Sequence, residues 1–390
     1  MPILMISDYK GLSPSINARW QNTLRWRVRL LAASVLLAST TMAAPWRFVV
    51  CGDTRGEGGA SDPYYNPTIL PEIASAVANM SPQPAFLLVP GDLINSGSLA
   101  GFRAWTNVMS PVYAAGIPIY PVLGNHDDND VTSYKAVFAA SIPNNGPSTE
   151  IDRTYFIAYS NVLILNLDTY VTSGQVNQSW INAVLATNTR PHIFAQGHMP
   201  AFKANHADCL DDYPTQRNTF WNSLSDVHCR IYFAGHDHFY NHAQINDGDG
   251  NATNDVHQMI VGTGGAPAYT SYAYDGDNNP YTPQLVYSEY ENGYVVVEID
   301  GYSATTTWYH RTGANSYVAT SEMFSYTLPV VCPTFAYSFD GGHLTLTWTN
   351  GVLQEAPDVA GTYTDVLGAV SPFVVTDLSA AQKFYRARAY

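Results

Sequence analysis

The chain has 390 residues, which is long enough for one large catalytic domain and a small companion. Lysine and arginine total 18 against 32 aspartate and glutamate residues, so the net charge is -14 at pH 7. This balance excludes a broad basic face for a nucleic acid backbone, and no polynucleotide is expected as a partner.

The amino terminus has the pattern of a secretory signal peptide. Three arginines between positions 25 and 29 precede an apolar run over residues 30–38, and small residues follow up to Ala44. A run of about ten apolar residues is too short for a transmembrane anchor, which needs about 20. We therefore expect residues 1–44 to be a cleaved signal peptide and the protein to be periplasmic or extracellular, with no membrane span after signal removal.

From residue 46 onward, short apolar runs alternate with amphipathic stretches. This alternation predicts an α/β domain over residues 45–327. The predicted strands cover residues 48–51, 86–89, 119–123, 162–167, 193–195, 231–234, 259–261, 294–299 and 304–308. Apolar residues at helical spacing predict helices within residues 69–80, 102–109, 180–185 and 220–224.

The last part of the chain has a different character. Residues 328–390 contain short alternating segments such as 344–348, with turns at Gly341-Gly342 and Asn350-Gly351. Asn-Gly between alternating strands is a strong hairpin signal. We expect a small all-β module that closes with a strand near residues 384–388. It has no cluster of titratable residues, so a structural or adhesive role is expected.

The four cysteines lie at positions 51, 209, 229 and 332. An exported chain is free to oxidise its thiols. Cys209 and Cys229 flank a predicted helix and are the pair that a disulfide would join. Cys51 lies inside an apolar strand, which predicts a buried free thiol.

Five short polar motifs follow the predicted strands, and glycine opens each of them. They read Gly52-Asp53-Thr54-Arg55, Gly91-Asp92-Leu93-Ile94, Gly124-Asn125-His126-Asp127, Gly197-His198-Met199-Pro200 and Gly235-His236-Asp237-His238. Ligands of open α/β sheets bind outside the carboxyl ends of the strands, so the motifs are expected to converge. Carboxylate oxygens and imidazole nitrogens together suit transition metals. The candidate ligands are Asp53, Asp92, Asn125, His198, His236 and His238.

In this order the motifs resemble those of the calcineurin-like metallophosphoesterases, a superfamily that includes purple acid phosphatases and cyclic nucleotide phosphodiesterases. The resemblance covers about residues 46–310. It implies a four-layer α-β-β-α sandwich of two mixed sheets. It also implies hydrolysis of a small phosphomonoester or phosphodiester by metal-hydroxide attack, with two divalent or trivalent transition-metal ions, Fe, Zn or Mn first among the candidates.

The resemblance also implies a role for each motif residue. Asp92 would bridge both ions, Asp53 and His238 would complete the first ion's ligands, and Asn125, His198 and His236 would complete the second's. Two ions about 3.5–4 Å apart can activate the attacking oxygen and hold the phosphoryl group. His126 would stabilise or protonate the leaving-group oxygen, and Asp127 would orient its imidazole. Asn125 and His126 would also contact the substrate.

One position departs from the family pattern. Most members carry a histidine two residues after the first aspartate, and this chain has Arg55. Purple acid phosphatases compensate with a tyrosine where this chain has Asn95. A water, Asn95 or a residue from elsewhere would fill the gap. Arg55 would contact a phosphate oxygen or pair with a loop carboxylate, and His206 is a further candidate for substrate contact.

A second hypothesis is a metal-binding scaffold with an impaired first metal site, acting in adhesion or carbohydrate association. The complete second set of ligands and the presence of His126 argue against it, because a scaffold needs no acid for a leaving group. The sequence leaves the ester, the metal and the oligomeric state open.

Overall fold

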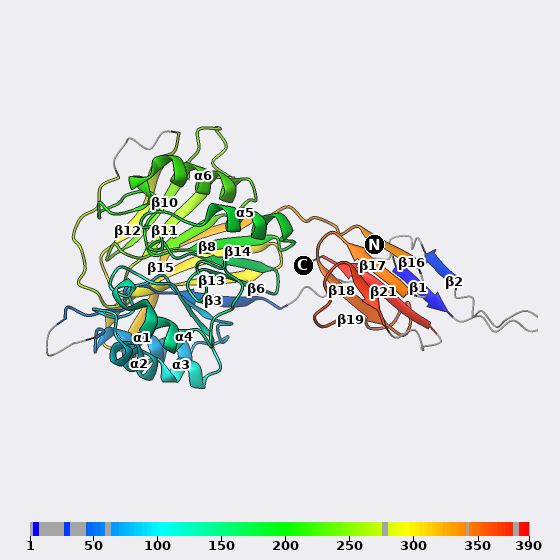
Figure 1. Cartoon of the computed structure of the whole chain (residues 1–390), viewed down its shortest axis with the longest axis horizontal. Helices are drawn as coiled ribbons and strands as arrows, with labels where there is room; N and C mark the ends of the chain where they lie inside the picture. Colours follow the sequence, from blue (N-terminus) through cyan, green and yellow to red (C-terminus); the bar gives the residue numbers. More distant parts are fainter. Residues whose placement is uncertain are drawn as a thin grey trace, which may run out of the picture. The chain divides into compact units, whose positions relative to one another are not determined.

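The computed structural model of the chain describes residues 3–7, 27–31, 44–58, 64–274, 280–340, 343–376 and 382–389. The chain divides into two compact units (Figure 1). The larger unit spans Ala44–Leu328, and the smaller one combines Pro329–Tyr390 with Met1–Ala43. All five motifs belong to the larger unit.

The first sheet of the larger unit has six strands in the order β15-β14-β13-β3-β4-β5. Strands β3, β4 and β5 run parallel, and β13, β14 and β15 extend the sheet, each antiparallel to its neighbour. The bounds are Trp46–Val50 for β3, Leu87–Val89 for β4, Ile119–Pro121 for β5, Gly293–Asp300 for β13, Ser303–Gly313 for β14 and Ser316–Thr327 for β15.

The second sheet has seven strands in the order β12-β10-β11-β9-β8-β7-β6. Strands β7, β8, β9 and β11 are parallel, and antiparallel strands close both edges. The bounds are Tyr155–Tyr159 for β6, Val162–Asn166 for β7, His192–Gln196 for β8, Ile231–Ala234 for β9, Tyr240–Asn246 for β10, Val256–Val261 for β11 and Thr282–Glu289 for β12.

Helices cover the outer face of each sheet, so the unit has four layers (Figure 1). Phe48 and Val50 of β3 face the core between the sheets, whereas Val49 of β3 and the next residue after the strand, Cys51, face the helices. The predicted α-β-β-α sandwich of two mixed sheets is confirmed. Over the six-stranded sheet lie α1 (Ile69–Ala78), α2 (Leu99–Val108), α3 (Ser110–Ala114) and α4 (Val131–Phe138). Over the seven-stranded sheet lie α5 (Gln178–Thr187) and α6 (Pro214–Ser225), and two 3-10 helices cover Asp128–Asp130 and Leu210–Asp212.

The smaller unit contains two antiparallel sheets, in the orders β16-β17-β20 and β19-β18-β21-β1-β2. Asn350 and Gly351 connect β17 to β18, and these strands lie in different sheets, so the hairpin predicted there is wrong. Strand β18 pairs instead with β21, the predicted closing strand. The turn predicted at Gly341-Gly342 lies outside the described residues. The bounds are Phe335–Asp340 for β16, His343–Trp348 for β17, Val352–Ala356 for β18, Thr364–Asp365 for β19, Phe373–Val375 for β20 and Gln382–Arg388 for β21.

Two short strands are described in the amino-terminal part, β1 (Ile3–Ser7) and β2 (Arg27–Leu31). Most of the apolar run of the predicted signal peptide, together with the cleavage region near Ala43, lies outside the described residues, so the signal peptide stays a prediction. Among the described residues, no helix combines the length and the apolar character needed to cross a membrane.

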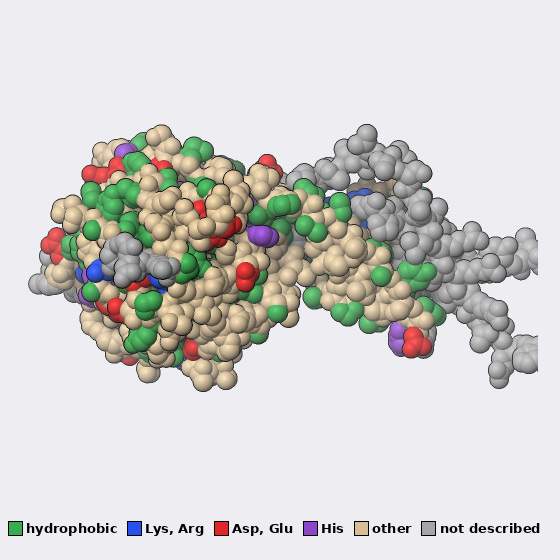
Figure 2. All heavy atoms as spheres, turned by 90° about the horizontal axis from the view of Figure 1, so that it is seen from above, with side chains coloured by type: hydrophobic (Ala, Val, Ile, Leu, Met, Phe, Trp, Pro, Cys, Tyr) green, Lys and Arg blue, Asp and Glu red, His purple; other side chains and the backbone are tan. Residues whose placement is uncertain are grey.

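All four cysteines are free thiols, so the disulfide considered between Cys209 and Cys229 is not formed. Each of the two thiols instead lies near a local carbonyl oxygen, that of Ala207 for Cys209 and that of Ile231 for Cys229. Cys51 is buried, as its place in an apolar strand predicts. On the face drawn in Figure 2, the described lysine and arginine side chains form no broad patch.

Candidate metal centre

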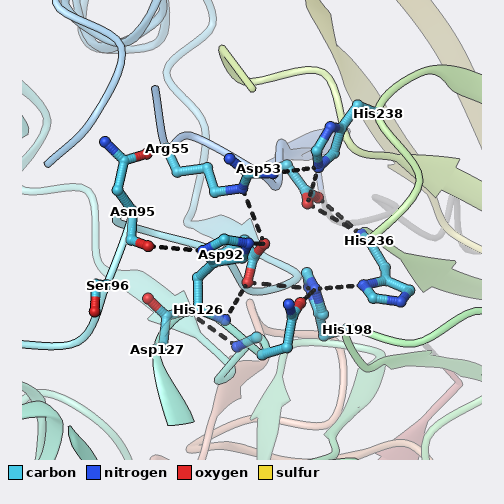
Figure 3. Close-up of polar contacts among 12 residues, drawn as sticks. Asp53, Arg55, Asp92, Asn95, Ser96, His126, Asp127, His198, His236 and His238 are labelled. Carbon is cyan, nitrogen blue, oxygen red and sulfur yellow. Dashed lines mark hydrogen bonds and ion pairs between the residues drawn. The ribbon is translucent and has the colours of Figure 1, made fainter. Parts of the chain in front are cut away.

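The candidate ligands meet at one edge of the sandwich. The motifs of Asp53, Asp92 and Asn125 follow β3, β4 and β5, while those of His198 and His236 follow β8 and β9. All five strands belong to the parallel parts of the two sheets, so their carboxyl ends deliver the side chains to the same place. Figure 3 shows Asp53, Asp92, His198, His236 and His238 pointing toward one another.

The backbone is strained where the chain leaves these strands. Asp53, Asp92 and His236 adopt left-handed conformations with φ of 53°, 52° and 71°. Residues with a Cβ rarely adopt such angles, and they persist where the surrounding structure fixes them. The amide N of Asp53 donates to the carbonyl O of Gly91 at 3.0 Å, which ties the first two motifs together. The strain therefore turns ligand side chains inward at the strand ends.

Two motif glycines leave room for the carboxylates. A Cβ on Gly124 would lie 2.1 Å from Oδ1 of Asp92, and a Cβ on Gly235 would lie 2.3 Å from Oδ2 of Asp53. Any larger residue at either position would displace a ligand carboxylate. The expectation that glycine avoids a Cβ at the strand ends is confirmed at these two positions.

One group of atoms fits a metal ion. Nε2 of His198 lies 3.1 Å from Oδ1 of Asn125, 3.2 Å from Nδ1 of His236 and 3.4 Å from Oδ1 of Asp92. Nδ1 of His198 donates to the carbonyl O of Pro90 at 2.8 Å, so Nε2 presents a lone pair. Ligand atoms about 2.1 Å from one ion lie about 3.0–3.4 Å apart. His198 thus lies at ligand spacing from the three other predicted ligands of the second ion, and its imidazole also forms a group with the carboxylates of Asp53 and Asp92 that could hold an ion.

Asp208 contacts this group from the side of His236, and no sequence motif singles it out. Its Oδ1 lies 3.2 Å from Nε2 of His236, and the hydrogen bond between them lowers the pKa of Asp208 to about 2. With a proton held on Nε2, His236 turns the lone pair of Nδ1 toward His198. The only signal was an aspartate in the loop after the fourth motif, which no spacing rule distinguishes from its neighbours.

The protonation states agree with metal binding. Burial lowers the pKa of His198 to about 4, and burial together with the nearby Arg55 lowers that of His238 to about 3. Both imidazoles are therefore neutral at pH 7, as metal ligands must be. Burial and the neighbouring Asp92 carboxylate raise the pKa of Asp53 well above its usual range. A cation beside two buried carboxylates this close would favour their charged forms.

The position of the predicted first ion holds the side chain of Arg55. Nε of Arg55 lies 3.3 Å from Oδ2 of Asp92, and Nη2 lies 3.4 Å from Nε2 of His238. Nε2 of His238 also lies 3.6 Å from Oδ1 of Asp53. A guanidinium stays protonated and cannot ligate a metal, so this position does not fit an ion as the second one does.

His126 lies beside the carboxylate of Asp92 and is half-buried. Its amide N donates to Oδ1 of Asp92 at 3.0 Å, and its Nδ1 lies 2.7 Å from the carbonyl O of Asn95 (Figure 3). A carbonyl oxygen only accepts, so Nδ1 carries a proton and Nε2 is the atom that faces the site. Nε2 lies 3.9 Å from Oδ2 of Asp92.

The role expected for Asp127 is corrected. Its buried carboxylate accepts hydrogen bonds from the backbone N–H groups of Leu93, Ile94 and Gly124, at 3.1, 3.3 and 3.0 Å. Within the described residues no contact joins Asp127 to the imidazole of His126, because the aspartate points into the loop and the histidine points out of it. Asp127 therefore joins the second motif to the third. The carbonyl of Asn95, a backbone atom that leaves no trace in the sequence, orients the imidazole.

His206 covers the ligands of the second site. Its ring stacks on that of His236 at a centroid distance of 4.1 Å. Its Nδ1 lies 2.8 Å from Oδ1 of Asp237, and its Nε2 lies 3.0 Å from the hydroxyl of Tyr269. Burial opposes the charge on His206, but the hydrogen bond with Asp237 raises the pKa above its usual value. The predicted contact of His206 with substrate stays a prediction.

The sandwich and its ligand cluster define a metallophosphoesterase domain. Residues 47–240 match the sequence model of the calcineurin-like phosphoesterase family, and this part of the chain belongs to that family. No curated protein matches the chain in sequence.

Two solved structures are similar to the chain. One is a purple acid phosphatase, PPD1, from yellow lupin (Lupinus luteus) seeds, with a TM-score of 0.56, 14% identity, and coverage of 84% of this chain and 69% of that one. The other is PhoD, with a TM-score of 0.53, 12% identity, and coverage of 84% and 83%. At these identities the likeness shows the fold alone.

Proposed function

We propose that this chain is an exported, metal-dependent phosphoesterase that hydrolyses small phosphomonoesters or phosphodiesters. The observation that carries the proposal is the convergence of four lone-pair atoms, from Asp92, Asn125, His198 and His236, next to a half-buried His126. Membership of the calcineurin-like phosphoesterase family supports phosphate esters as the substrate class.

An ion of Fe, Zn or Mn at this position would supply a Lewis acid for a phosphoryl oxygen and would lower the pKa of a water. The chain's own residues do the rest. Because Nδ1 of His126 is committed to the carbonyl of Asn95, the protonated imidazole delivers its other proton from Nε2 to the leaving-group oxygen. Arg55 presents N–H groups to the phosphoryl oxygens from the opposite side of Asp92.

The resemblance predicts two ions, held by two ligand sets that share Asp92. Of these two ions, the one at the second set is part of this proposal, because its side chains lie at ligand spacing around Nε2 of His198. In the first set, Asp92 and His238 are in contact with the guanidinium of Arg55. Export through the predicted signal peptide over residues 1–44 is likewise proposed, from the arginines and the apolar run of that segment.

The test is hydrolysis of p-nitrophenyl phosphate and bis-p-nitrophenyl phosphate by the full chain with added Mn, Zn, Fe, Co or Ni. Asp92→Ala removes the bridging carboxylate, and His343→Ala, an exposed histidine on β17, is the matched control. We expect metal-dependent turnover in the control and none in Asp92→Ala, and the preferred ester separates a monoesterase from a diesterase. Tight binding of an ion with no turnover of any ester would favour the metal-binding scaffold instead.

A further inference from the structure

The first metal position of this site is occupied by a side chain. We infer that the chain binds a single transition-metal ion, at the second position, and that the guanidinium of Arg55 replaces the first ion as the cation that holds the phosphoryl group. The part of the inference that concerns phosphate rests on the proposed phosphoesterase function. The part that concerns metal content does not.

The ligands expected for the first ion are already engaged. Arg55 contacts two of them, Oδ2 of Asp92 at 3.3 Å and Nε2 of His238 at 3.4 Å (Figure 3). The third ligand, Asp53, accepts hydrogen bonds from the backbone N–H of His236 on both carboxylate oxygens, at 3.1 and 3.0 Å. An ion at this position would have to displace the guanidinium from both of its partners.

The tautomer of His238 shows that the guanidinium of Arg55 and a first metal ion cannot both contact this histidine. Nδ1 of His238 donates to the carbonyl O of Pro267 at 2.8 Å, so Nε2 carries the lone pair. That lone pair accepts a hydrogen bond from an N–H group of Nη2 of Arg55, and it cannot bind an ion at the same time. Nε2 of His198 differs, because its neighbours are three acceptor atoms and no cationic side chain.

The charge balance leads to the same conclusion. Asp53 and Asp92 are buried and supply two negative charges. One divalent ion and the guanidinium together supply three positive charges, which offset these two carboxylates and that of Asp208 beside His236. A second divalent ion would lie next to the guanidinium of Arg55, and the two cations would repel each other.

Arg55 can also perform the task of the ion that it replaces. Nη1 donates to the carbonyl O of Gly56 at 3.2 Å, and Nη2 donates to His238. Among the described residues, each terminal nitrogen thus has one partner and retains one N–H group. The side chain is 15% exposed, so these groups are reachable from the site. Two such N–H groups can bind two phosphoryl oxygens in a bidentate manner.

The experiment counts metal ions rather than turnover. Native mass spectrometry gives the number of Mn ions per full-length chain, and electron paramagnetic resonance separates an isolated Mn(II) from a coupled pair. We expect one isolated Mn in the wild type. Arg55→His supplies the imidazole that the family pattern has at this position, and we expect two coupled ions in that variant.

Two further variants locate the ion without altering Arg55. His238→Ala removes a ligand of the first position only and is expected to retain one Mn, whereas His198→Ala is expected to lose it. His343→Ala on β17 is the matched control. The inference is overturned by two coupled ions in the wild type, by loss of the ion in His238→Ala, or by a folded Arg55→His variant that still binds one.

The phosphate part has its own measurement. Arg55→Gln is expected to bind inorganic phosphate at least tenfold more weakly than the wild type at unchanged Mn content, and equal affinity would overturn this role. If the wild type binds two ions and hydrolyses esters, the single-ion inference is wrong and the proposed phosphoesterase function stands. If the wild type binds one ion and hydrolyses no ester, the single-ion inference stands and the proposed phosphoesterase function is wrong.

Discussion

Nδ1 of His126 lies 2.7 Å from the backbone carbonyl O of Asn95. This contact fixes the tautomer of the histidine and leaves Nε2 as the atom that can pass a proton to a substrate. The imidazole is held by the loop after β4 and projects from the loop after β5, so its position depends on how two neighbouring strands of the six-stranded sheet end. A role in leaving-group protonation follows from this geometry.

Substitution of His126 by glutamine tests that role. We expect kcat to fall by about 10²–10⁴-fold for phenyl phosphate, whose leaving group needs a proton. The loss should be smaller for p-nitrophenyl phosphate, because nitrophenolate leaves readily without one. Steady-state kinetics at matched Mn content measures both, and an equal loss for the two esters would contradict a proton-donor role.

Asp127→Asn tests the corrected role of the neighbouring residue. The carboxylate accepts three backbone N–H groups, and an amide offers one oxygen to replace two, so at least one buried N–H loses its partner. We expect the free energy of unfolding to fall by about 1–3 kcal/mol. Urea unfolding measures it, with Asp226→Asn at the exposed end of α6 as the control. Equal stability of the two variants would show that the loop does not depend on Asp127.

Asp208→Asn tests the support of the second metal position. Removing the charge weakens the hold on Nε2 of His236, which lies 3.2 Å away. We expect Mn affinity to fall by about 10–100-fold, the usual effect of losing such a partner. Isothermal titration of Mn into each protein measures it, and Asp212→Asn, in the nearby 3-10 helix, should bind as the wild type does. Unchanged affinity in Asp208→Asn would mean that His236 is positioned by other groups.

A pH dependence is expected from the ion pair between Glu72 on α1 and Arg311 on β14. Nε and Nη2 of Arg311 lie 2.7 and 3.0 Å from the two carboxylate oxygens. This pairing lowers the pKa of Glu72 below its ordinary value of 4.5. Its stabilisation is therefore present above about pH 4.5 and is lost as the pH falls through the lowered pKa.

Glu72→Gln should lower the free energy of unfolding at pH 7 by about 1–3 kcal/mol. The difference from the wild type should shrink as the pH falls below 4.5, the ordinary pKa of the carboxyl group. Urea unfolding between pH 3 and pH 7, expressed relative to the wild type, is the measurement. A difference that stays constant over this range would show that the pair contributes no charge-dependent stability.

Much of the fold could be predicted because its inner strands are short, apolar and buried. Strands such as β7 and β8 are buried along their whole length, and they read as continuous apolar runs. Strand β12 was missed because it lies at a sheet edge and most of its side chains are exposed or half-buried, so it has no clear alternation. The helix α4 was missed because it has only eight residues and buries few of them.

The site was predictable where side chains act and unpredictable where the backbone or distant loops act. The metal ligands are recognisable in the sequence as polar motifs that follow strands. Their convergence follows from the topology of parallel strands. The carbonyl of Asn95 has no sequence signal. Asp127 stands next to His126 in sequence, yet the turn after β5 directs the two side chains to opposite sides. The sequence raised a salt bridge for Arg55 without showing that its partner is Asp92.

The central claim is that hydrolysis of phosphate esters depends on a metal ion held at Asp92. The most direct measurement is turnover of p-nitrophenyl phosphate by the full chain before chelation, after EDTA treatment, and after Mn is restored, in the wild type and in Asp92→Ala. The account predicts that chelation abolishes turnover, that Mn restores it, and that Asp92→Ala stays inactive while its circular dichroism spectrum matches the wild type. Turnover that survives chelation, or that persists in Asp92→Ala, would contradict it.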